Sequence, residues 1–189
     1  MKQLSIFLSI GFLILFAAPT CAQDEGTKTQ VGGIRVGWNY SQYFNDGNPV
    51  VGTSDYSSFY AGFYRDNRIA QILRLGTGVE YYQNAAFTND NNKRVLHYIG
   101  VPVYLKVKLG PVFALSGFEP SFKVGENYTV LGLEVDPPKK TNGFDAPFFL
   151  GAGVNIAIFT VELRYHWGTI DVFNSARSQY LQVGGAVSF

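Results

Sequence analysis

The chain has 189 residues, a length that suits one domain or at most two. It contains 15 lysines and arginines against 14 aspartates and glutamates, so it lacks the basic surplus that a nucleic-acid-binding protein needs. The single cysteine, Cys21, excludes a fold held together by disulfides within the chain. We therefore expect no nucleic-acid partner, and a fold stabilised by packing or by a closed network of hydrogen bonds.

The N-terminal segment has the organisation of a secretory signal peptide. A positive charge near the start is followed by an uncharged apolar run over residues 6–18, which is too short for a stable membrane span, and by the small residue Ala22. Acylation of Cys21, as in a lipoprotein, is the alternative, but the residues before it fit such processing poorly. We expect residues 1–22 to be cleaved off and residues 23–189 to form one barrel domain with 14 bases and 14 acids.

Eight stretches of the expected mature chain alternate apolar and polar side chains with a period of two, as strands do. No long segment shows helical periodicity. The whole chain contains 12 tyrosines and 16 phenylalanines, which favour strands. The expected strands cover residues 31–40, 58–65, 69–82, 94–108, 112–122, 147–157, 160–167 and 178–189.

The connections between these strands alternate between long and short. The short ones are 66–68, 109–111 and 158–159, and the long ones are 41–57, 83–93, 123–146 and 168–177. Outer-membrane barrels have this asymmetry, with short periplasmic turns and long extracellular loops, and an even strand number brings both termini to one end. The sequence therefore predicts an all-β fold, a closed antiparallel up-and-down eight-stranded transmembrane β-barrel. We expect it in the bacterial outer membrane with its N- and C-termini periplasmic.

The two faces of the expected strands differ in character. In the strand at 160–167, for example, Val161 and Leu163 alternate with Glu162 and Arg164. A water-soluble sandwich also fits this alternation, but glycines gather on the polar face, where they suit the crowded interior of a narrow barrel. We therefore expect the apolar face to meet lipid and the polar face to fill the lumen. The glycines are Gly32 or Gly33, Gly62, Gly76, Gly78, Gly100, Gly151, Gly153 and Gly184.

Seven charged side chains fall on the inward face. They could line a pore, but an eight-stranded barrel is only just wide enough to be filled by side chains, and confined charges are costly unless they are paired. We therefore expect an internal ion-pair network, in which Glu80 and Glu162 each contact an inward base, and little conductance. The seven residues are Arg35, Arg74, Glu80, Lys106, Lys108, Glu162 and Arg164.

Five further residues need both a structural and a functional interpretation. Pro102 cannot donate to a ladder, so we expect a β-bulge there. Trp38 and Trp167 lie on the outer face near the loop end, where interfacial anchoring is expected rather than ligand binding. His97 and His166 are the only histidines and supply too few ligands for a metal site. We therefore assign no catalytic, cofactor-binding or metal-binding residue, and no cofactor.

Four segments carry a resemblance to known proteins: HYIGVPVYLKVKLG (97–110), FFLGAGVNI (148–156), VELRYHWGTIDVF (161–173) and YLQVGGAVSF (180–189). The first three resemble strands of the PorT-like outer-membrane β-barrel domains of Bacteroidetes. The last resembles the C-terminal assembly signal of bacterial outer-membrane barrels. The resemblance implies a small barrel surrounded by outer-membrane lipid and lipopolysaccharide, which the barrel-assembly machinery inserts. It implies little about activity.

Three functions are compatible with these features. A non-enzymatic barrel with a structural, surface-interaction or secretion-accessory role, contacting a protein partner through extracellular loops such as 123–146, needs no missing residue. A membrane-embedded hydrolase or acyltransferase needs Ser, His and acid groups that converge near the loop end, and no nucleophile motif accompanies His97. A secreted lipocalin-like barrel needs an apolar interior, whereas the inward face here carries charges. We favour the first function.

Overall fold

The computed structural model describes residues 29–45, 48–49, 53–54, 56–88, 92–136, 141–172 and 176–189. These residues include no helix that is long and apolar enough to span a membrane. The expected signal peptide, residues 1–22, lies outside the described part of the chain.

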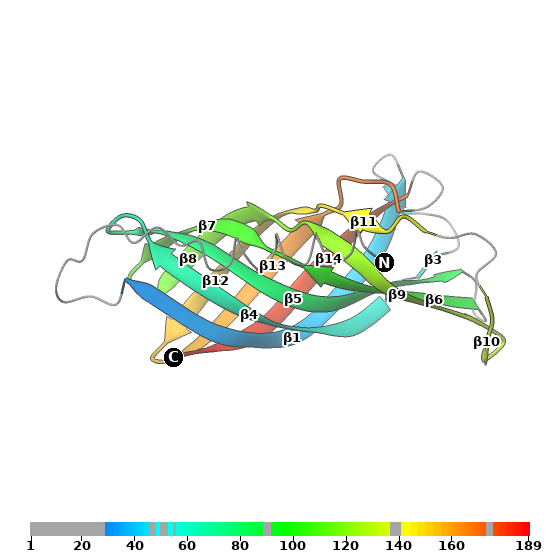
Figure 1. Cartoon of the computed structure of the whole chain (residues 1–189), viewed down its shortest axis with the longest axis horizontal. Helices are drawn as coiled ribbons and strands as arrows, with labels where there is room; N and C mark the ends of the chain where they lie inside the picture. Colours follow the sequence, from blue (N-terminus) through cyan, green and yellow to red (C-terminus); the bar gives the residue numbers. More distant parts are fainter. Residues whose placement is uncertain are drawn as a thin grey trace, which may run out of the picture.

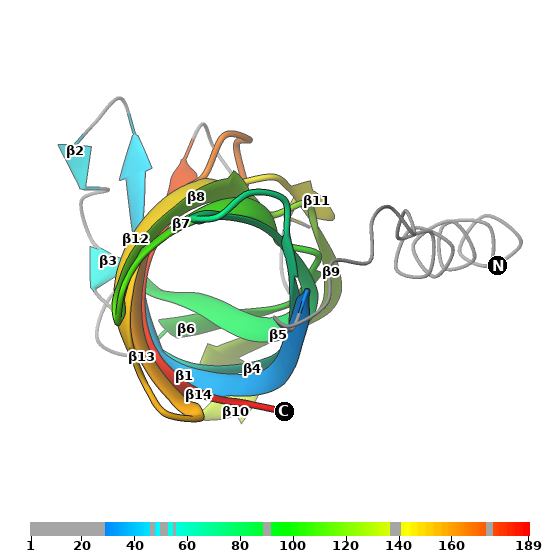
Figure 2. The ribbon, with the colours of Figure 1, turned by 90° about the vertical axis from the view of Figure 1, so that its left-hand side faces the viewer.

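Eight antiparallel strands form one sheet that closes into a barrel, as the sequence predicts (Figure 1, Figure 2). Two of the eight are interrupted near a proline and carry two labels each. The eight are β1 (Gln30–Asn45), β4 (Tyr56–Arg68), β5 (Leu73–Thr88), β6 with β7 (Asn92–Gly100, Val103–Leu109), β8 with β9 (Val112–Phe118, Ser121–Val130), β12 (Phe148–Ile156), β13 (Phe159–Trp167) and β14 (Arg177–Ser188). Four two-residue strands add to the sheet: β2 (Asn48–Pro49), β3 (Thr53–Ser54), β10 (Leu133–Glu134) and β11 (Phe144–Asp145).

The first and last strands close the barrel. β14 pairs antiparallel with β1 along its length, from Gly33 opposite Ser188 to Phe44 opposite Arg177. Every other neighbouring pair in the ring is also antiparallel. Closure leaves no sheet edge along the wall, which a membrane requires because hydrocarbon cannot satisfy unpaired backbone groups.

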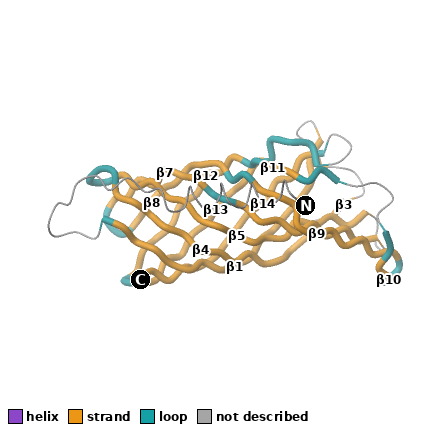
Figure 3. Tube along the Cα trace, viewed as in Figure 1, coloured by secondary structure: helices purple, strands orange, loops and turns teal. Residues whose placement is uncertain are grey.

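The two ends of the barrel differ in the length of their connections (Figure 3). At one end, which we call the turn end, residues 69–72, 110–111 and 157–158 join consecutive strands, and residue 189 lies beside them. At the other, the loop end, strands continue beyond the predicted boundaries, and β9 with β10 projects furthest in Figure 1. Longer connections follow β1, β9 and β13, as predicted. The predicted long connection at 83–93 was wrong, because most of these residues extend β5 and β6 and pair with one another, and only residues 89–91 lie between the two strands.

One predicted turn is displaced. Residues 66–68, expected as the first short turn, complete β4 and pair with both β1 and β5. The backbone N–H of Arg68 donates to Thr29 O at 2.8 Å, and the turn follows at residues 69–72. The polar sequence of residues 66–68 suggested a turn, but its pairing on both sides keeps it in the sheet.

The ladder is interrupted at Pro102, but no β-bulge forms there. The prediction of a bulge at Pro102 was therefore wrong. The pairing of β6 and β7 with β5 keeps the same register on both sides of the interruption. Gly78 N still donates to Pro102 O at 3.1 Å, so the proline removes one ladder bond and needs no extra residue. A register shift occurs instead between His97 and Tyr98 of β6, against β9.

The outer face is apolar along the wall of the barrel. Large apolar side chains stand exposed on every strand, including Trp38 at 71%, Phe63 at 64% and Val161 at 57%. A folded domain in water would bury such a continuous surface. The outward face therefore fits the predicted contact with lipid.

A girdle of aromatic rings borders this apolar face toward the loop end. Ring centroids lie 5.7 Å apart in the pair Phe59 and Tyr81, and 6.1 Å apart in the pair Phe148 and Trp167. Trp38 lies opposite Phe59 in the ladder. Both tryptophans point outward at this level, as predicted for side chains at a membrane interface.

Inward glycines make room for large side chains in the lumen. A Cβ on Gly76 would lie 2.1 Å from the ring of Tyr104, and one on Gly37 would lie 2.7 Å from the ring of Tyr60. Rings and glycines on neighbouring strands therefore fit together across the wall. This packing explains why the polar face carries so many glycines.

The outward face provides a test of the membrane assignment. Leu163 lies midway along β13 and is 47% exposed, while Leu133 is 71% exposed beyond the girdle. We expect Leu163→Arg to cost about 2–4 kcal/mol of folding free energy, because the charge enters hydrocarbon. The matched change Leu133→Arg should cost almost nothing. Urea titration of refolding into lipid vesicles measures both, and equal tolerance of the two changes would contradict a lipid-facing wall.

Candidate functional site

Four charged side chains form an ion-pair network across the middle of the lumen. Arg164 of β13 donates both ends of its guanidinium to Glu80 of β5, at 2.9 and 2.8 Å. Arg35 of β1 lies 3.1 Å from Glu80, and Glu162 lies 3.4 Å from both Arg35 and Arg164. All four side chains are at most 3% exposed. The prediction that Glu80 and Glu162 each contact an inward base is confirmed. The two pairs of Glu80 and the pair of Arg35 with Glu162 join strands that are not neighbours, while Arg164 and Glu162 both belong to β13.

A second cluster continues the network toward the turn end. Arg35 donates to the hydroxyl of Tyr104 at 2.8 Å, and that hydroxyl donates to Asp66 at 2.7 Å. The other oxygen of Asp66 accepts from Lys106 Nζ at 2.6 Å. Asp66 was missed because the sequence placed it in a turn. The alternation of β4 points Tyr60 and Tyr64 inward. If the alternation is extended by two residues, it places Asp66 in the lumen as well.

Two of the seven predicted inward charges do not join the network. Arg74 and Lys108 line a pocket at the turn end and are only partly buried. Neither has an ion pair among the described residues. The structure therefore divides the predicted cluster into a paired centre and a basic turn end.

A buried carboxyl and a histidine lie above the network, on the loop-end side. His166 Nδ1 is 3.5 Å from Glu119 Oε2, and both side chains are fully buried. The His166 ring stacks between Phe149 and Tyr180, with centroid distances of 4.8 and 4.2 Å. Glu119 has no distinguishing sequence motif, although the alternation of its strand points it inward.

The two histidines lie apart, in different surroundings. His97 lies on the outer side of β6, where the Tyr81 hydroxyl contacts Nδ1 at 2.6 Å and Asn127 contacts Nε2 at 3.0 Å. His166 is enclosed by aromatic rings in the lumen. Within the described part of the chain, no hydrogen bond joins either ring to a serine hydroxyl, and no group of three or more potential metal ligands occurs.

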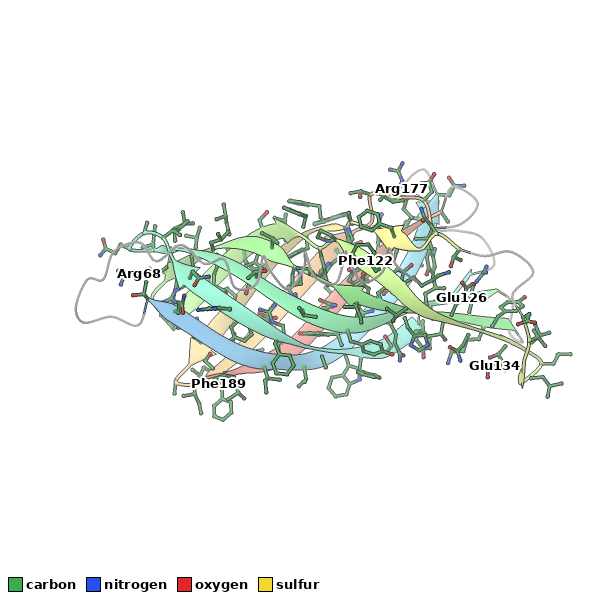
Figure 4. The ribbon with its side chains drawn as sticks, in the orientation of Figure 1. Arg68, Phe122, Glu126, Glu134, Arg177 and Phe189 are labelled. Carbon is green, nitrogen blue, oxygen red and sulfur yellow. The ribbon has the colours of Figure 1, made fainter. Side chains whose placement is uncertain are left out.

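Glu126 gathers two bases and a hydroxyl at the loop end, beyond the aromatic girdle (Figure 4). Arg94 Nε donates to Glu126 at 2.7 Å, Lys123 lies 2.5 Å from it and Thr141 Oγ1 donates at 2.9 Å. Partial burial raises the pKa of Glu126, but the hydrogen bonds from Lys123, Thr141 and Arg94 outweigh it and bring the pKa below its ordinary value of 4.5. A carboxyl with a lowered pKa stabilises the fold above that value and loses its contribution as the pH falls below it. The cluster therefore ties β6, β9 and the segment at residue 141 together at neutral pH.

Beyond this cluster, β9 and β10 form a hairpin with an apolar tip. Leu131 and Leu133 are 72% and 71% exposed there. The turn residues Leu131 and Gly132 have φ of 52° and 83°, the left-handed values of a two-residue hairpin turn. Leucine rarely adopts such a φ. The tip of this hairpin therefore presents two exposed leucines, one of them at a left-handed φ.

Comparison with known proteins agrees with this geometry. The sequence matches the family described as outer membrane protein beta-barrel domain over residues 22–174. No curated protein sequence matches the chain.

The solved structures that are similar to this one include Neisserial surface protein A (NspA) and Ail. NspA is 15% identical, with a TM-score of 0.55, and the match covers 87% of this chain and 100% of NspA. Ail, the attachment invasion locus protein of Yersinia pestis, was solved in complex with the heparin analogue sucrose octasulfate. It is 11% identical, with a TM-score of 0.54 and coverage of 86% of this chain and 100% of Ail. Such identities establish a shared fold. With most of its length matched, the chain belongs to the outer membrane protein beta-barrel domain family.

Proposed function

We propose that this outer-membrane barrel is a non-enzymatic, non-conducting surface-interaction protein that acts through its loop end. In this proposal residues 1–22 are a cleaved signal peptide, the turn end and both termini are periplasmic, and the loop end is extracellular. The barrel-assembly machinery inserts the chain, and lipopolysaccharide surrounds it. The segments at 97–110, 148–156 and 161–173 support a place among the PorT-like barrels, whose link to secretion makes an accessory role in secretion one form of this function.

The apolar hairpin tip is the observation that carries the proposal. Leu131 and Leu133 stand exposed beyond the girdle, so neither lipid nor the barrel core covers them. The left-handed φ of Leu131 belongs to the two-residue hairpin turn, as that of Ala157 belongs to the turn at 157–158. The exposure of the two leucines is therefore the feature that a protein partner would explain by burying the tip.

Charge at the loop end indicates the kind of partner. The four long connections contain eight acids and five bases, and Glu126 already pairs with Arg94 and Lys123. A sulfated polyanion of the type bound to Ail would meet net negative charge here. We therefore favour a neutral or basic protein surface as the partner.

The filled lumen supports a protein that does not conduct. The paired side chains Arg35, Glu80, Glu162 and Arg164 cross the lumen from three strands. Enzyme activity has less support, because the two histidines lie apart and neither contacts a nucleophile among the described residues.

The ion-pair network should behave as a unit. We expect Glu80→Gln to cost about 3–5 kcal/mol, because it leaves buried guanidinium groups short of counter-charge. The double change Glu80→Gln with Arg164→Gln should cost less than Glu80→Gln alone. Urea refolding titrations measure these effects, with Arg177→Gln as the control, since its pair with Asp171 is half exposed and should contribute at most about 1 kcal/mol. A cost for the double variant equal to the sum of its single changes would contradict the network.

The wild-type protein should show little or no steady conductance in a planar lipid bilayer. The reason is that paired side chains occupy the width of the lumen. Recordings use folded protein, identified by its heat-dependent migration on gels. A stable water-filled channel would contradict the filled lumen and restore a pore function.

A change at the hairpin tip should weaken partner contact without impairing folding. We expect Leu131→Asn to keep or raise stability, because asparagine tolerates a left-handed φ, while weakening partner contact. A photo-crosslinking residue at Glu134 in intact cells reports that contact. Leu109→Asn, at an exposed leucine of the turn end, is the control and should leave the crosslinks unchanged. Crosslinks that persist in Leu131→Asn would rule out the tip as the contact site.

A further inference from the structure

The turn end of the lumen contains a pocket that the proposed function does not use. Its volume is about 230 Å³, several times the roughly 30 Å³ that a water molecule occupies in the liquid. Arg74 of β5 and Lys106 and Lys108 of β7 line it, together with Asp66, Tyr64 and Ser188. The pocket therefore brings three bases to the mouth of the barrel, against one acidic side chain and the terminal carboxylate of Phe189.

The one acidic side chain of the lining, Asp66, is already engaged. One oxygen of Asp66 accepts from Lys106 at 2.6 Å and the other from the Tyr104 hydroxyl at 2.7 Å. The next acid along the lumen, Glu162, lies within 3.4 Å of both Arg35 and Arg164. Among the described residues, neither Arg74 nor Lys108 forms an ion pair with an acidic side chain. With the terminal carboxylate of Phe189 counted beside Asp66, the three bases leave the pocket with a surplus of one positive charge.

The sheet register concentrates this charge further. Arg68 of β4 lies directly opposite Arg74 of β5, and Arg74 lies directly opposite Lys106 of β7. Like charges directly opposite in an antiparallel pair repel and destabilise it. Lys108 adds a fourth base two residues along the same face of β7. Asp66 offsets part of this repulsion through Lys106, and an anion beside Arg74 and Lys108 would offset the rest. Figure 4 shows Arg68 at the turn end, at the opposite end of the barrel from Glu126 and Glu134.

The donors suit an anion with several oxygen atoms. Arginine presents a planar fork that matches phosphate, and lysine supplies a point charge beside it. The hydroxyls of Tyr64 and Ser188 lie 2.7 Å apart in the pocket wall and can add neutral hydrogen bonds. We propose that this pocket binds a phosphate group, with Arg74 and Lys108 as the main contacts and Lys106 shared between the ligand and Asp66.

The phosphate can belong to either of two sources. Ile158 and Phe189 line the rim and are 54% and 75% exposed, so the pocket adjoins the apolar outer surface. A phospholipid headgroup can enter from this rim, and a soluble phosphate compound can enter from the mouth. The chemistry at Arg74 and Lys108 is the same for both.

Calorimetric titration tests the soluble source. Folded protein in a non-ionic detergent is titrated with inorganic phosphate and with glycerol phosphate, at a constant ionic strength of about 0.1 M, where distant charges are screened. We expect saturable binding to the wild type and a rise in its thermal midpoint. In the double variant Arg74→Gln with Lys108→Gln, the affinity should fall by about tenfold or more, because charge-assisted hydrogen bonds are lost. Arg177→Gln removes one exposed base at the loop end and should bind as the wild type does.

A stability measurement separates binding from a structural role. Without phosphate, the double variant should unfold at a higher temperature than the wild type, because the repulsion among these bases is reduced. With phosphate, the difference between the two unfolding temperatures should shrink or change sign, because only the wild type gains a ligand. A double variant that is less stable than the wild type in both conditions would overturn the proposal. If the double variant does not fold, Lys108→Gln alone serves, since Lys108 is only half-buried.

Native mass spectrometry tests the lipid source. Detergent micelles contain either phosphatidylglycerol or diacylglycerol, which lacks the phosphate. Retention of phosphatidylglycerol by the wild type and by Arg177→Gln, and its loss from the double variant, supports a headgroup. Binding of soluble phosphate alone supports a soluble ligand. If neither ligand binds the wild type, or if the double variant binds as well as the wild type, the proposal is wrong.

Discussion

Closure of the ladder between β1 and β14 is the constraint on which the rest of the structure depends. In hydrocarbon, backbone groups have no water to bond, so the wall must pair every strand on both sides. Closing after eight strands fixes a lumen that side chains can fill. That width explains the glycines: a Cβ on Gly62 would lie 2.5 Å from the Glu80 side chain, and one on Gly100 would lie 2.2 Å from Glu119. Large inward side chains therefore fit where a neighbouring strand has a glycine.

Position along this narrow lumen decides which charges pair. In the middle, a charge has little water around it and is stable only with a partner of opposite sign. Arg35, Arg164, Glu80 and Glu162 meet that condition from strands that are not neighbours, so their pairs also brace the barrel across its width. At the turn end, solvent is closer, and Arg74 remains without an acidic partner among the described residues. The same inward face therefore produces a paired centre and a basic mouth.

The sequence predicted the eight strands, their order, both faces and the central ion pairs, because period-two alternation and loop length depend on local sequence. It failed where tertiary pairing decided the outcome. Residues 66–68 resemble a turn but pair with strands on both sides. Pro102 resembles a bulge site, yet the ladder keeps its register around it. The Glu126 cluster was missed because its members come from three segments, which only the fold brings together.

A continuous chain of contacts joins the turn-end pocket to the central network. It runs from Lys106 through Asp66 and the Tyr104 hydroxyl to Arg35, which in turn contacts Glu80. Such a chain carries a signal only if it has two discrete arrangements. Here every link lies within hydrogen-bond or ion-pair distance, and the close approach of glycines to the rings leaves little room for a second arrangement. We therefore interpret the chain as a brace. An anion at Arg74 and a partner at the loop end would then bind independently, on either side of a rigid plug.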